Sequence, residues 1–357
     1  MLTNFKLNRV NFADRYKERG YNNPRVLELL SKTSGVHTIS FELNNVDASV
    51  ANAIRRCVRD ETPKRVMTFN VSDVETNSPF ILTHLEDIIN RFKLIPITQS
   101  IPMDAVMTYS AENNTDEEYV SIYTDQLKGN NNYCDTTYKI GNLNSYQYFR
   151  IKKITVIEGR GIEHACFQAP IGFTYTPIDY TCIDYAMENV VVAVIVKNTF
   201  GEKKRRLVNP GGKYPVPDGY DEVITDEIPY YNTNMVEPRD YKISFTFDNH
   251  FNGKEYFIKS LLVLIEKLKA AANTTFISVE GDTTTINLPL ETATLGMLIS
   301  RGIYELNPEI AYVCAHNRHL TEPNMEIRIT DPNVKSLYAT TIKKRIELIE
   351  GLIANIK

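Results

Sequence analysis

The chain has 357 residues, of which 43% are hydrophobic and 24% are charged, so it carries enough apolar side chains for two or three cores and is not disordered as a whole. Its 40 Lys and Arg residues are balanced by 44 Asp and Glu residues, which leaves a net charge of −4. This balance excludes a strong positive field and argues against a protein that binds nucleic acid on its own.

The five cysteines are scattered, odd in number and never arranged as Cys-x-x-Cys. This usage argues against a disulfide framework or a zinc ribbon and favours a reducing compartment. The N-terminal segment is charged and interrupted, and no later apolar run approaches the roughly 18 residues of a membrane span. We therefore expect a soluble protein without a secretion signal.

The first hundred residues predict two strands, at 37–43 and 66–74, each followed by a helix. The first helix begins after Asp47, a good N-cap residue, and runs to Arg59 with one apolar stripe. The second helix is predicted at 79–95, where a Ser-Pro pair gives a start signal and a proline closes it.

Beyond residue 100 the sequence is polar and rich in Asn and Tyr, which is typical of short strands joined by long turns. Residues 197–239 are rich in Gly, Pro and charged side chains, which predicts a mobile surface insertion. Further strands of this part are predicted at 148–157, 172–175, 190–196 and 241–247.

The last third begins with a long amphipathic helix at 254–272, and Asn273-Thr274 forms a joint to a compact tail. A final helix follows Asp331-Pro332 and carries an apolar stripe too wide for a chain end that packs on nothing. Between these long helices, the tail is predicted to contain a helix at 293–304 and strands at 275–279, 284–290, 311–314 and 325–329.

An internal repeat relates the tail to the head at a constant offset of 245 positions (295 minus 50; 308 minus 63). In each half a strand is followed by a helix with small residues, a proline and further strands, and the half ends in a long helix with an apolar face. Two such units are expected to bury these helices against each other as an intramolecular pseudo-dimer. The matches are Val50-Ala51 with Leu295-Gly296, Ile54 with Ile299, Arg56 with Arg301, and Pro63 with Pro308.

Motifs for catalysis or metal binding are weak. Gly211-Gly212-Lys213 lacks the other residues of a Walker motif and is interpreted as a turn. The basic run at 203–206 favours a solvated hairpin over a localisation signal or a phosphate contact. Cys314, His316 and His319 offer three metal ligands, but a structural zinc site needs a fourth. We found no nucleophile–base pair in the sequence.

Arginines near the ends of predicted helices are the remaining candidates for a binding role: Arg55, Arg56, Arg59, Arg91 and Arg301. Small residues beside them suit the close approach of a partner helix and bidentate pairing with carboxylates or carbonyls. The alternative is that each is an ordinary helix C-terminal charge favoured by the helix dipole.

Several segments, taken in their order and spacing, closely resemble the alpha-like subunit family of multisubunit DNA-directed RNA polymerases. These segments are NVDASVANAIRR at 45–56, ETP at 61–63, VETN at 74–77 and RFKLIP at 91–96. Residues 159–165, GRGIEHA, resemble the loop that leads back from the inserted domain of that family. This first part of the chain is similar to the third subunit of eukaryotic polymerase II.

The tail resembles the eleventh subunit of that polymerase. Thr294-Leu295-Gly296 stands where those subunits have an acidic-His-Thr-Leu-Gly-Asn helix start, and His319 where they have His-Pro. The acidic-His pair is replaced here by Thr292-Ala293, the Asn by Met297 and the Pro by Leu320. A chain that carries both halves resembles a subunit fusion of the kind found in nucleocytoplasmic large DNA viruses.

The resemblance implies an α+β fold with two alpha-subunit-like dimerisation units and a mostly β inserted domain. The first, third-subunit-like unit is expected at residues 1–62 and 174–272 and the inserted domain at 63–173. The second, eleventh-subunit-like unit is expected at 273–357.

The implied function is a non-catalytic platform on which the two largest, catalytic polymerase subunits assemble, together with small polymerase subunits and at one copy per polymerase. Neither sequence-specific contact with nucleic acid nor contact with a membrane is expected. The expected docking residues are Asn52, Arg55, Arg56, Arg91, Gly159, Arg160, Gly161, Glu163 and His164. The expected pseudo-dimer residues are Leu261, Leu264, Leu268, Ile342, Ile346 and Ile349.

No catalytic residue and no cofactor is expected in this chain. No metal is expected either, because the four-cysteine zinc loop of several relatives is reduced here to Cys134. The expected location is the site of viral transcription, in the host cytoplasm and the virion, with the nucleus as an alternative. Two other functions stay open. One is a general scaffold protein of a viral particle or complex, and the other is a stand-alone nucleotide-using enzyme.

Overall fold

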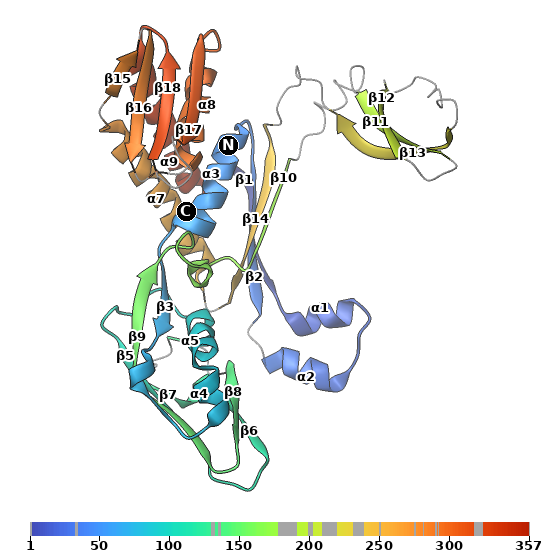
Figure 1. Cartoon of the computed structure of the whole chain (residues 1–357), viewed down its shortest axis with the longest axis vertical. Coiled ribbons are helices and arrows are strands. Elements are labelled where there is room, and N and C mark those ends of the chain that lie inside the picture. The colour runs from blue at the N-terminus through green and yellow to red at the C-terminus, as the bar shows by residue number, and fades with distance from the viewer. Residues whose placement is uncertain are drawn as a thin grey trace.

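The structure is a computed structural model (Figure 1). Within the described residues, strands pair antiparallel in five sheets and alternate with helices, so the predicted α+β class is confirmed. No helix of the described residues is long and apolar enough to cross a membrane. The structure describes residues 2–32, 35–129, 133–134, 137–177, 191–198, 203–208, 220–230, 239–249, 251–274, 276–280, 282–289, 291, 293–317 and 324–356.

The first unit is a four-stranded sheet with strand order β1-β2-β14-β10. The apolar side chains that alternate along β2 and β14 are buried in its core, as the sequence periodicity predicts. The predicted inserted-domain boundary at residue 173 falls inside β10, which belongs to this sheet. The elements of the unit are β1 (Leu2–Val10), β2 (Val36–Leu43), α3 (Ala48–Arg56), the π-helical turn η1 (Cys57–Glu61), β10 (Gly172–Pro177), β14 (Tyr241–Asp248) and α7 (Gly253–Ala272).

The second unit repeats this arrangement in a much shorter segment. Its strand order is β15-β16-β18-β17. In both units the two central strands are the second and the last, a small helix follows the second strand, and a long helix follows the last. The elements are β15 (Phe276–Glu280), β16 (Thr283–Pro289), α8 (Ala293–Leu306), β17 (Tyr312–Asn317), β18 (Asn324–Thr330) and α9 (Val334–Ile356).

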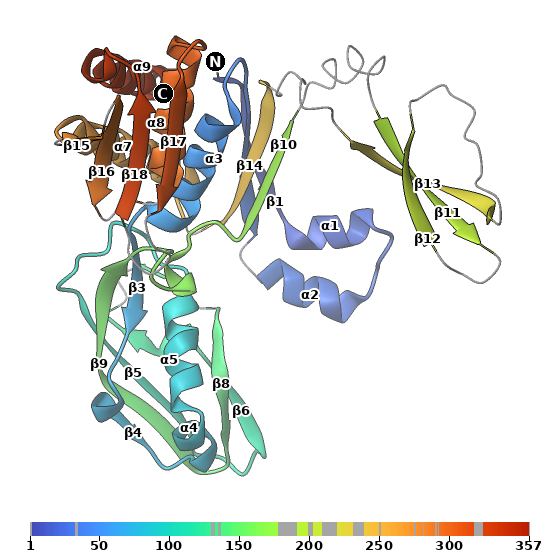
Figure 2. The same cartoon turned by 45° about the horizontal axis from the view of Figure 1, so that its top comes forward.

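Helices of the two units pack against each other, α7 on α9 and α3 on α8 (Figures 1 and 2). The apolar faces of these helices belong to one continuous core that also includes side chains of both sheets. The Tyr338 hydroxyl on α9 donates a hydrogen bond to the Ala271 carbonyl at the end of α7, at 3.0 Å. Gly302 brings α8 close to α9, because a Cβ atom there would lie 2.6 Å from Cγ2 of Thr341.

The inserted domain has a hydrophobic core of its own, in which α5 packs on β3 and Phe92 is buried (Figure 2). Its main sheet has the order β3-β9-β5-β7, with β4 also paired to β9, and β6 pairs separately with β8. Its elements are β3 (Lys64–Thr68), η2 (Val71–Asp73), β4 (Val74–Thr76), α4 (Pro79–Thr83), α5 (Leu85–Leu94), β5 (Val106–Asn113), β6 (Tyr119–Tyr123), η3 (Thr124–Gln126), β7 (Leu127–Lys128), β8 (Lys139–Asn144), β9 (Gln147–Gly159) and η4 (Ala165–Phe167).

Two predictions for this domain were wrong in detail. The single strand expected at 66–74 is divided into β3 and β4, because the turn at Val71–Asp73 redirects the chain between them. The single helix expected at 79–95 is divided at His84, whose backbone leaves the helical region with φ −112° and ψ 29°.

The strand predicted at 190–196 is found as β11 (Val191–Asn198), but several other elements were not predicted. The segment predicted as a mobile surface insertion, 197–239, contains the strands β12 (Lys203–Val208) and β13 (Tyr220–Tyr230), which pair with β11 in a sheet of order β12-β11-β13. β1 and the two helices between β1 and β2, which Figure 1 shows packed together, were not predicted. The two helices that were not predicted are α1 (Phe12–Glu18) and α2 (Pro24–Lys32).

Candidate functional site

The helix α3 begins as the sequence predicts. The Asp47 side chain caps it by accepting a hydrogen bond from the Ser49 backbone N–H at 2.7 Å. The predicted apolar stripe of Val50, Ile54, Cys57 and Val58 is fully buried. The opposite side of the helix is left half-exposed, and it carries Asn52, Arg55, Arg56 and Arg59.

The last turn of this helix is a π-helical turn. The Thr62 backbone N–H bonds to the Cys57 carbonyl five residues earlier at 3.0 Å, and the Thr62 hydroxyl bonds to the same oxygen at 2.7 Å. The Tyr256 hydroxyl of α7 donates to the Thr62 carbonyl at 3.0 Å, which anchors the turn to the long helix. The helix therefore ends later than the predicted Arg59 and in a fixed position.

The loop at residues 159–165 lies against this turn. The Ile162 backbone N–H donates to the Asp60 carbonyl at 2.9 Å. A Cβ atom on Gly161 would meet the Arg59 carbonyl oxygen, and a Cβ atom on Gly159 would lie 2.6 Å from the ring of Phe167. Gly161 is thus required by the close approach of the loop to the backbone at the helix end, whereas Gly159 makes room for the Phe167 ring.

The other predicted residues of the loop face solvent. Arg160 and Glu163 pair with each other at 3.1 Å, half-exposed on both sides. The His164 side chain is exposed and accepts a hydrogen bond from the Cys166 backbone N–H at 3.2 Å. Ile162, which the sequence analysis did not single out, is 52% exposed between them. These side chains and the half-exposed side of α3 and η1 form what we call the arginine surface.

Arg55 is held in place within this surface. Its guanidinium donates twice to Oδ1 of Asn52, at 2.8 and 3.0 Å, and lies 5.5 Å from the ring centre of Phe173. Burial, with the neighbouring Arg59 and Arg56, lowers the pKa of Arg55 below its ordinary value. Three arginines close enough to influence one another form a concentrated positive patch suited to carboxylates or carbonyls of a partner.

Arg59 anchors the edge of the surface. It forms a two-point ion pair with Asp60, at 2.8 and 3.1 Å, and this hydrogen bonding raises the pKa of Arg59. The buried Asp60 also accepts a hydrogen bond from Gln168 at 3.4 Å. Asp60 and Gln168 were missed by sequence reasoning, because nothing in the local pattern shows that the loop packs on the helix end.

Arg91 lies apart from this set, on α5 of the inserted domain. Its guanidinium donates to the Ile140 carbonyl of β8 at 2.8 Å, so the bond connects two elements of that domain. The residue itself is exposed. The structure therefore brings together eight of the nine predicted docking residues and places Arg91 in a different environment.

The six residues predicted for the internal pairing all lie on α7 or α9 and belong to the core shared by the two units. Ile346 is partly buried, and the other five are fully buried: Leu261, Leu264, Leu268, Ile342 and Ile349.

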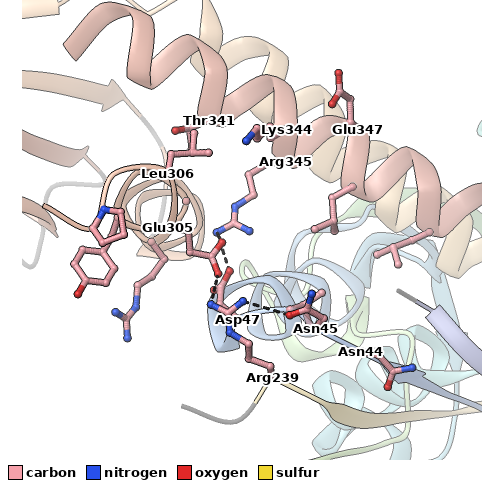
Figure 3. A pocket seen from close by; sticks show the side chains of 17 residues that line it. Asn44, Asn45, Asp47, Arg239, Glu305, Leu306, Thr341, Lys344, Arg345 and Glu347 are labelled. Atoms are coloured by element: carbon pink, nitrogen blue, oxygen red, sulfur yellow. Dashed lines mark hydrogen bonds and ion pairs between the residues drawn. The ribbon is translucent and has the colours of Figure 1, made fainter. Parts of the chain in front are cut away.

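A cleft of about 1000 Å³ opens where α3 begins, α8 ends and α9 passes (Figure 3). On its wall Arg345 pairs with Asp47, and Arg239 pairs with Glu305 at 3.2 Å and with Oδ1 of Asn45 at 3.3 Å. The cleft is lined by Asn44, Asn45, Val46, Asp47, Arg239, Arg301, Gly302, Tyr304, Glu305, Leu306, Pro308, Thr341, Lys344, Arg345, Glu347, Leu348 and Leu352. Ion pairs of Arg345 and Arg239 with Asp47 and Glu305 thus connect the segments that line the cleft.

Metal ligands do not gather within the part of the chain that the structure describes, where no three His, Cys, Asp or Glu side chains could hold an ion. Cys314 and His316 lie on β17, and His316 is 3.5 Å from Glu326, whereas His319 lies outside the described residues. Cys134 is buried in the core of the inserted domain.

Comparison with known protein-family models gave no match, and comparison with curated proteins gave none either.

Proposed function

We propose that this chain is a non-catalytic platform subunit of a DNA-dependent RNA polymerase, on which the two largest, catalytic subunits assemble for transcription. The proposal rests first on the motif order NVDASVANAIRR, ETP, VETN and RFKLIP, which resembles the alpha-like subunits. The motif GRGIEHA adds a second argument, because its Gly161 and Ile162 contact the backbone at the end of the helix that begins in the first motif. Motifs that are distant in sequence thus contribute to one surface.

The observation that carries the proposal is the duplicated topology of the two units. The shared strand order, the small helix after the second strand and the long helix after the last strand support an internal repeat of one ancestral unit. The contacts of α7 with α9 and of α3 with α8 support an intramolecular pseudo-dimer, which corresponds to a fusion of the third-subunit-like and eleventh-subunit-like units.

The arginine surface is the proposed docking site for a large subunit. Asn52 holds Arg55, Asp60 holds Arg59 and Glu163 holds Arg160, so these three side chains have little entropy left to lose on binding. Ile162 offers an exposed apolar contact beside the charges, as interfaces commonly do. One copy per polymerase would act at the site of viral transcription, in the host cytoplasm and the virion.

Co-expression tests this function directly. The tagged chain, produced together with the two largest polymerase subunits and the small subunits of the same source, is expected to retain both large chains through purification. Recovery of particle proteins in their place from the source would favour the scaffold alternative. Nucleotide turnover by the pure chain would favour the enzyme alternative and contradict the proposal.

A further inference from the structure

Two cations lie on the long helices, the buried Arg345 and the half-buried Lys267, and each binds an acid from the opposite unit. The first is Arg345 on α9. Its Nη2 is 2.7 Å from Oδ2 of Asp47, the N-cap residue of α3, and 3.2 Å from Oε2 of Glu305 near the end of α8. Its Nε donates to the Leu298 carbonyl at 3.3 Å. The Arg345 side chain is only 7% exposed, so these contacts replace its hydration.

The second cation is Lys267 on α7. Its Nζ lies 2.9 Å from Oε2 of Glu61, at the end of η1, and 2.9 Å from Oε2 of Glu291, just before α8. Burial alone would lower the pKa of Lys267, but the two carboxylates outweigh it and raise the pKa above the ordinary value. The lysine therefore stays charged inside the protein.

The two clusters have the same plan with the units exchanged. Each cation comes from the long helix of one unit. It binds one acid at the end of the small helix of its own unit and one acid at the start of the small helix of the other unit. The two starting acids lie 244 positions apart (291 minus 47), and so do the two ending acids (305 minus 61). Such reciprocity is the property of an isologous, two-fold interface.

Sequence reasoning missed both cations, although the heptad spacing of each from a buried residue indicates its position. Arg345 stands seven residues after Tyr338, and Lys267 seven residues after Ser260, so both lie on the buried faces of their helices. Apolar replacements would fill these places without any cost of removing charge from water. Buried charges that bind across an interface are well suited to fixing which surfaces meet and in which register.

We infer that Arg345 and Lys267 are equivalent register residues, and that each unit recognises a partner by an acid at the start of the partner's small helix. The partner that this interface fits is a second unit of the same topology with a carboxylate at that position. The inference rests on the pairing of units proposed above and is independent of the polymerase assignment.

The test uses the full chain with a protease site inserted after Asn273 and cut after folding. Dissociation of the two pieces is followed on a support that holds the first piece. Asp47→Asn and Glu291→Gln each remove one carboxylate that binds across the interface, and Asn keeps the N-cap function. Each variant is expected to speed dissociation at least tenfold, and the double variant by about the product of the two effects.

Glu61→Gln and Glu305→Gln are the matched controls. They remove the same charge from the same cations, but from acids of the cation's own unit, whose contacts persist after separation. For these two controls, the dissociation rate of the pieces is expected to change less than threefold. If the cross-unit and own-unit variants speed dissociation equally, the inference about register residues is overturned, but the pairing of units is not. Separation of the unmutated pieces would instead contradict the pairing of units. If one cross-unit variant fails to fold by circular dichroism, the other decides.

Discussion

Gly161 packs so closely on the carbonyl oxygen of Arg59 that a side chain has no room between the loop and the helix end. Gly161→Ala is therefore expected to displace the loop and to lower the free energy of unfolding by about 1–3 kcal/mol. Thermal unfolding measures the loss. Gly141→Ala is the matched control, because a Cβ atom there has no neighbour within 4 Å. Equal melting temperatures of the two variants would show that the loop accommodates a side chain freely.

Arg56→Glu is expected to leave the fold intact and to prevent capture of a large polymerase subunit, as the proposed function requires. Arg56 is half-exposed and lies off the buried stripe of α3, so the reversal costs the fold about 0.5 kcal/mol. At a desolvated docking surface, a reversed charge costs roughly 2–5 kcal/mol, which weakens a nanomolar complex toward micromolar.

Circular dichroism and melting check the fold of the Arg56 variant, and co-expression pull-down checks binding. Lys343→Glu is the control, because Lys343 is a 78% exposed cation on α9, away from the arginine surface. If the Arg56→Glu protein folds normally and captures the large subunits at wild-type yield, Arg56 is not part of the docking surface and is a solvated charge at the helix end.

Lys64 gives the protein a specific dependence of stability on pH. Its Nζ donates to the carbonyls of Cys166 and Gln168 at 2.9 and 3.0 Å, and burial lowers its pKa to about 8. Between pH 8 and the ordinary value of 10.5, the unfolded chain binds the proton and the folded chain does not. The free energy of unfolding therefore rises with pH across this window, and below pH 8 the folded state bears the cost of the buried ammonium.

The Lys64→Met variant is expected to lack this rise, which amounts to about 2 kcal/mol after allowance for the partial exposure of the lysine. Urea unfolding of both proteins at pH 7.5 and pH 10 gives the comparison, and the difference between the two proteins cancels the other titrating groups. Parallel pH curves for the two proteins would mean that Lys64 titrates normally.

Cys57 is expected to resist thiol reagents until the first unit opens. Its side chain is fully buried, its Sγ donates to the Ser260 carbonyl of α7 at 3.1 Å, and burial raises its pKa to about 12. Among the four cysteines of the described residues, Cys314 on the half-exposed strand β17 is expected to react before the three buried ones. Mass spectrometry of peptides after brief alkylation locates the label, and rapid labelling of Cys57 would show that α3 separates readily from α7.

The sequence predicted elements whose apolar side chains follow a clear period. The long helices α7 and α9 were found within a few residues of their bounds, and so were the central strands β2, β14, β16 and β18. β1 was missed because it is an edge strand with mostly exposed side chains, so its sequence shows little alternation. β12 begins with a basic run that composition alone cannot distinguish from a loop.

Sequence reasoning could anticipate contacts between residues that are close in sequence, but it missed contacts that join distant segments. Asn52 and Arg55 are neighbours on one helix, so their spacing is readable from the sequence. Asp47 and Arg345 are separated by almost the whole chain, and only the packing of α9 on the other helices brings them together. No local pattern contains that information.

The pairing of β2 with β14 has a consequence for how the chain acquires its structure. Leu43 lies beside Tyr241, so the central pair of the first sheet closes a loop that contains the whole inserted domain. The inserted domain has its own core and can fold as soon as it leaves the ribosome. At that stage β2 still lacks its partner strand β14, so its apolar side is exposed. Long-range closure of this kind is slow, so refolding should show a fast phase in the inserted domain and a slow phase in the first sheet. During synthesis, the apolar side of β2 therefore has no partner strand from this sheet on its Tyr241 side until β14 has been made.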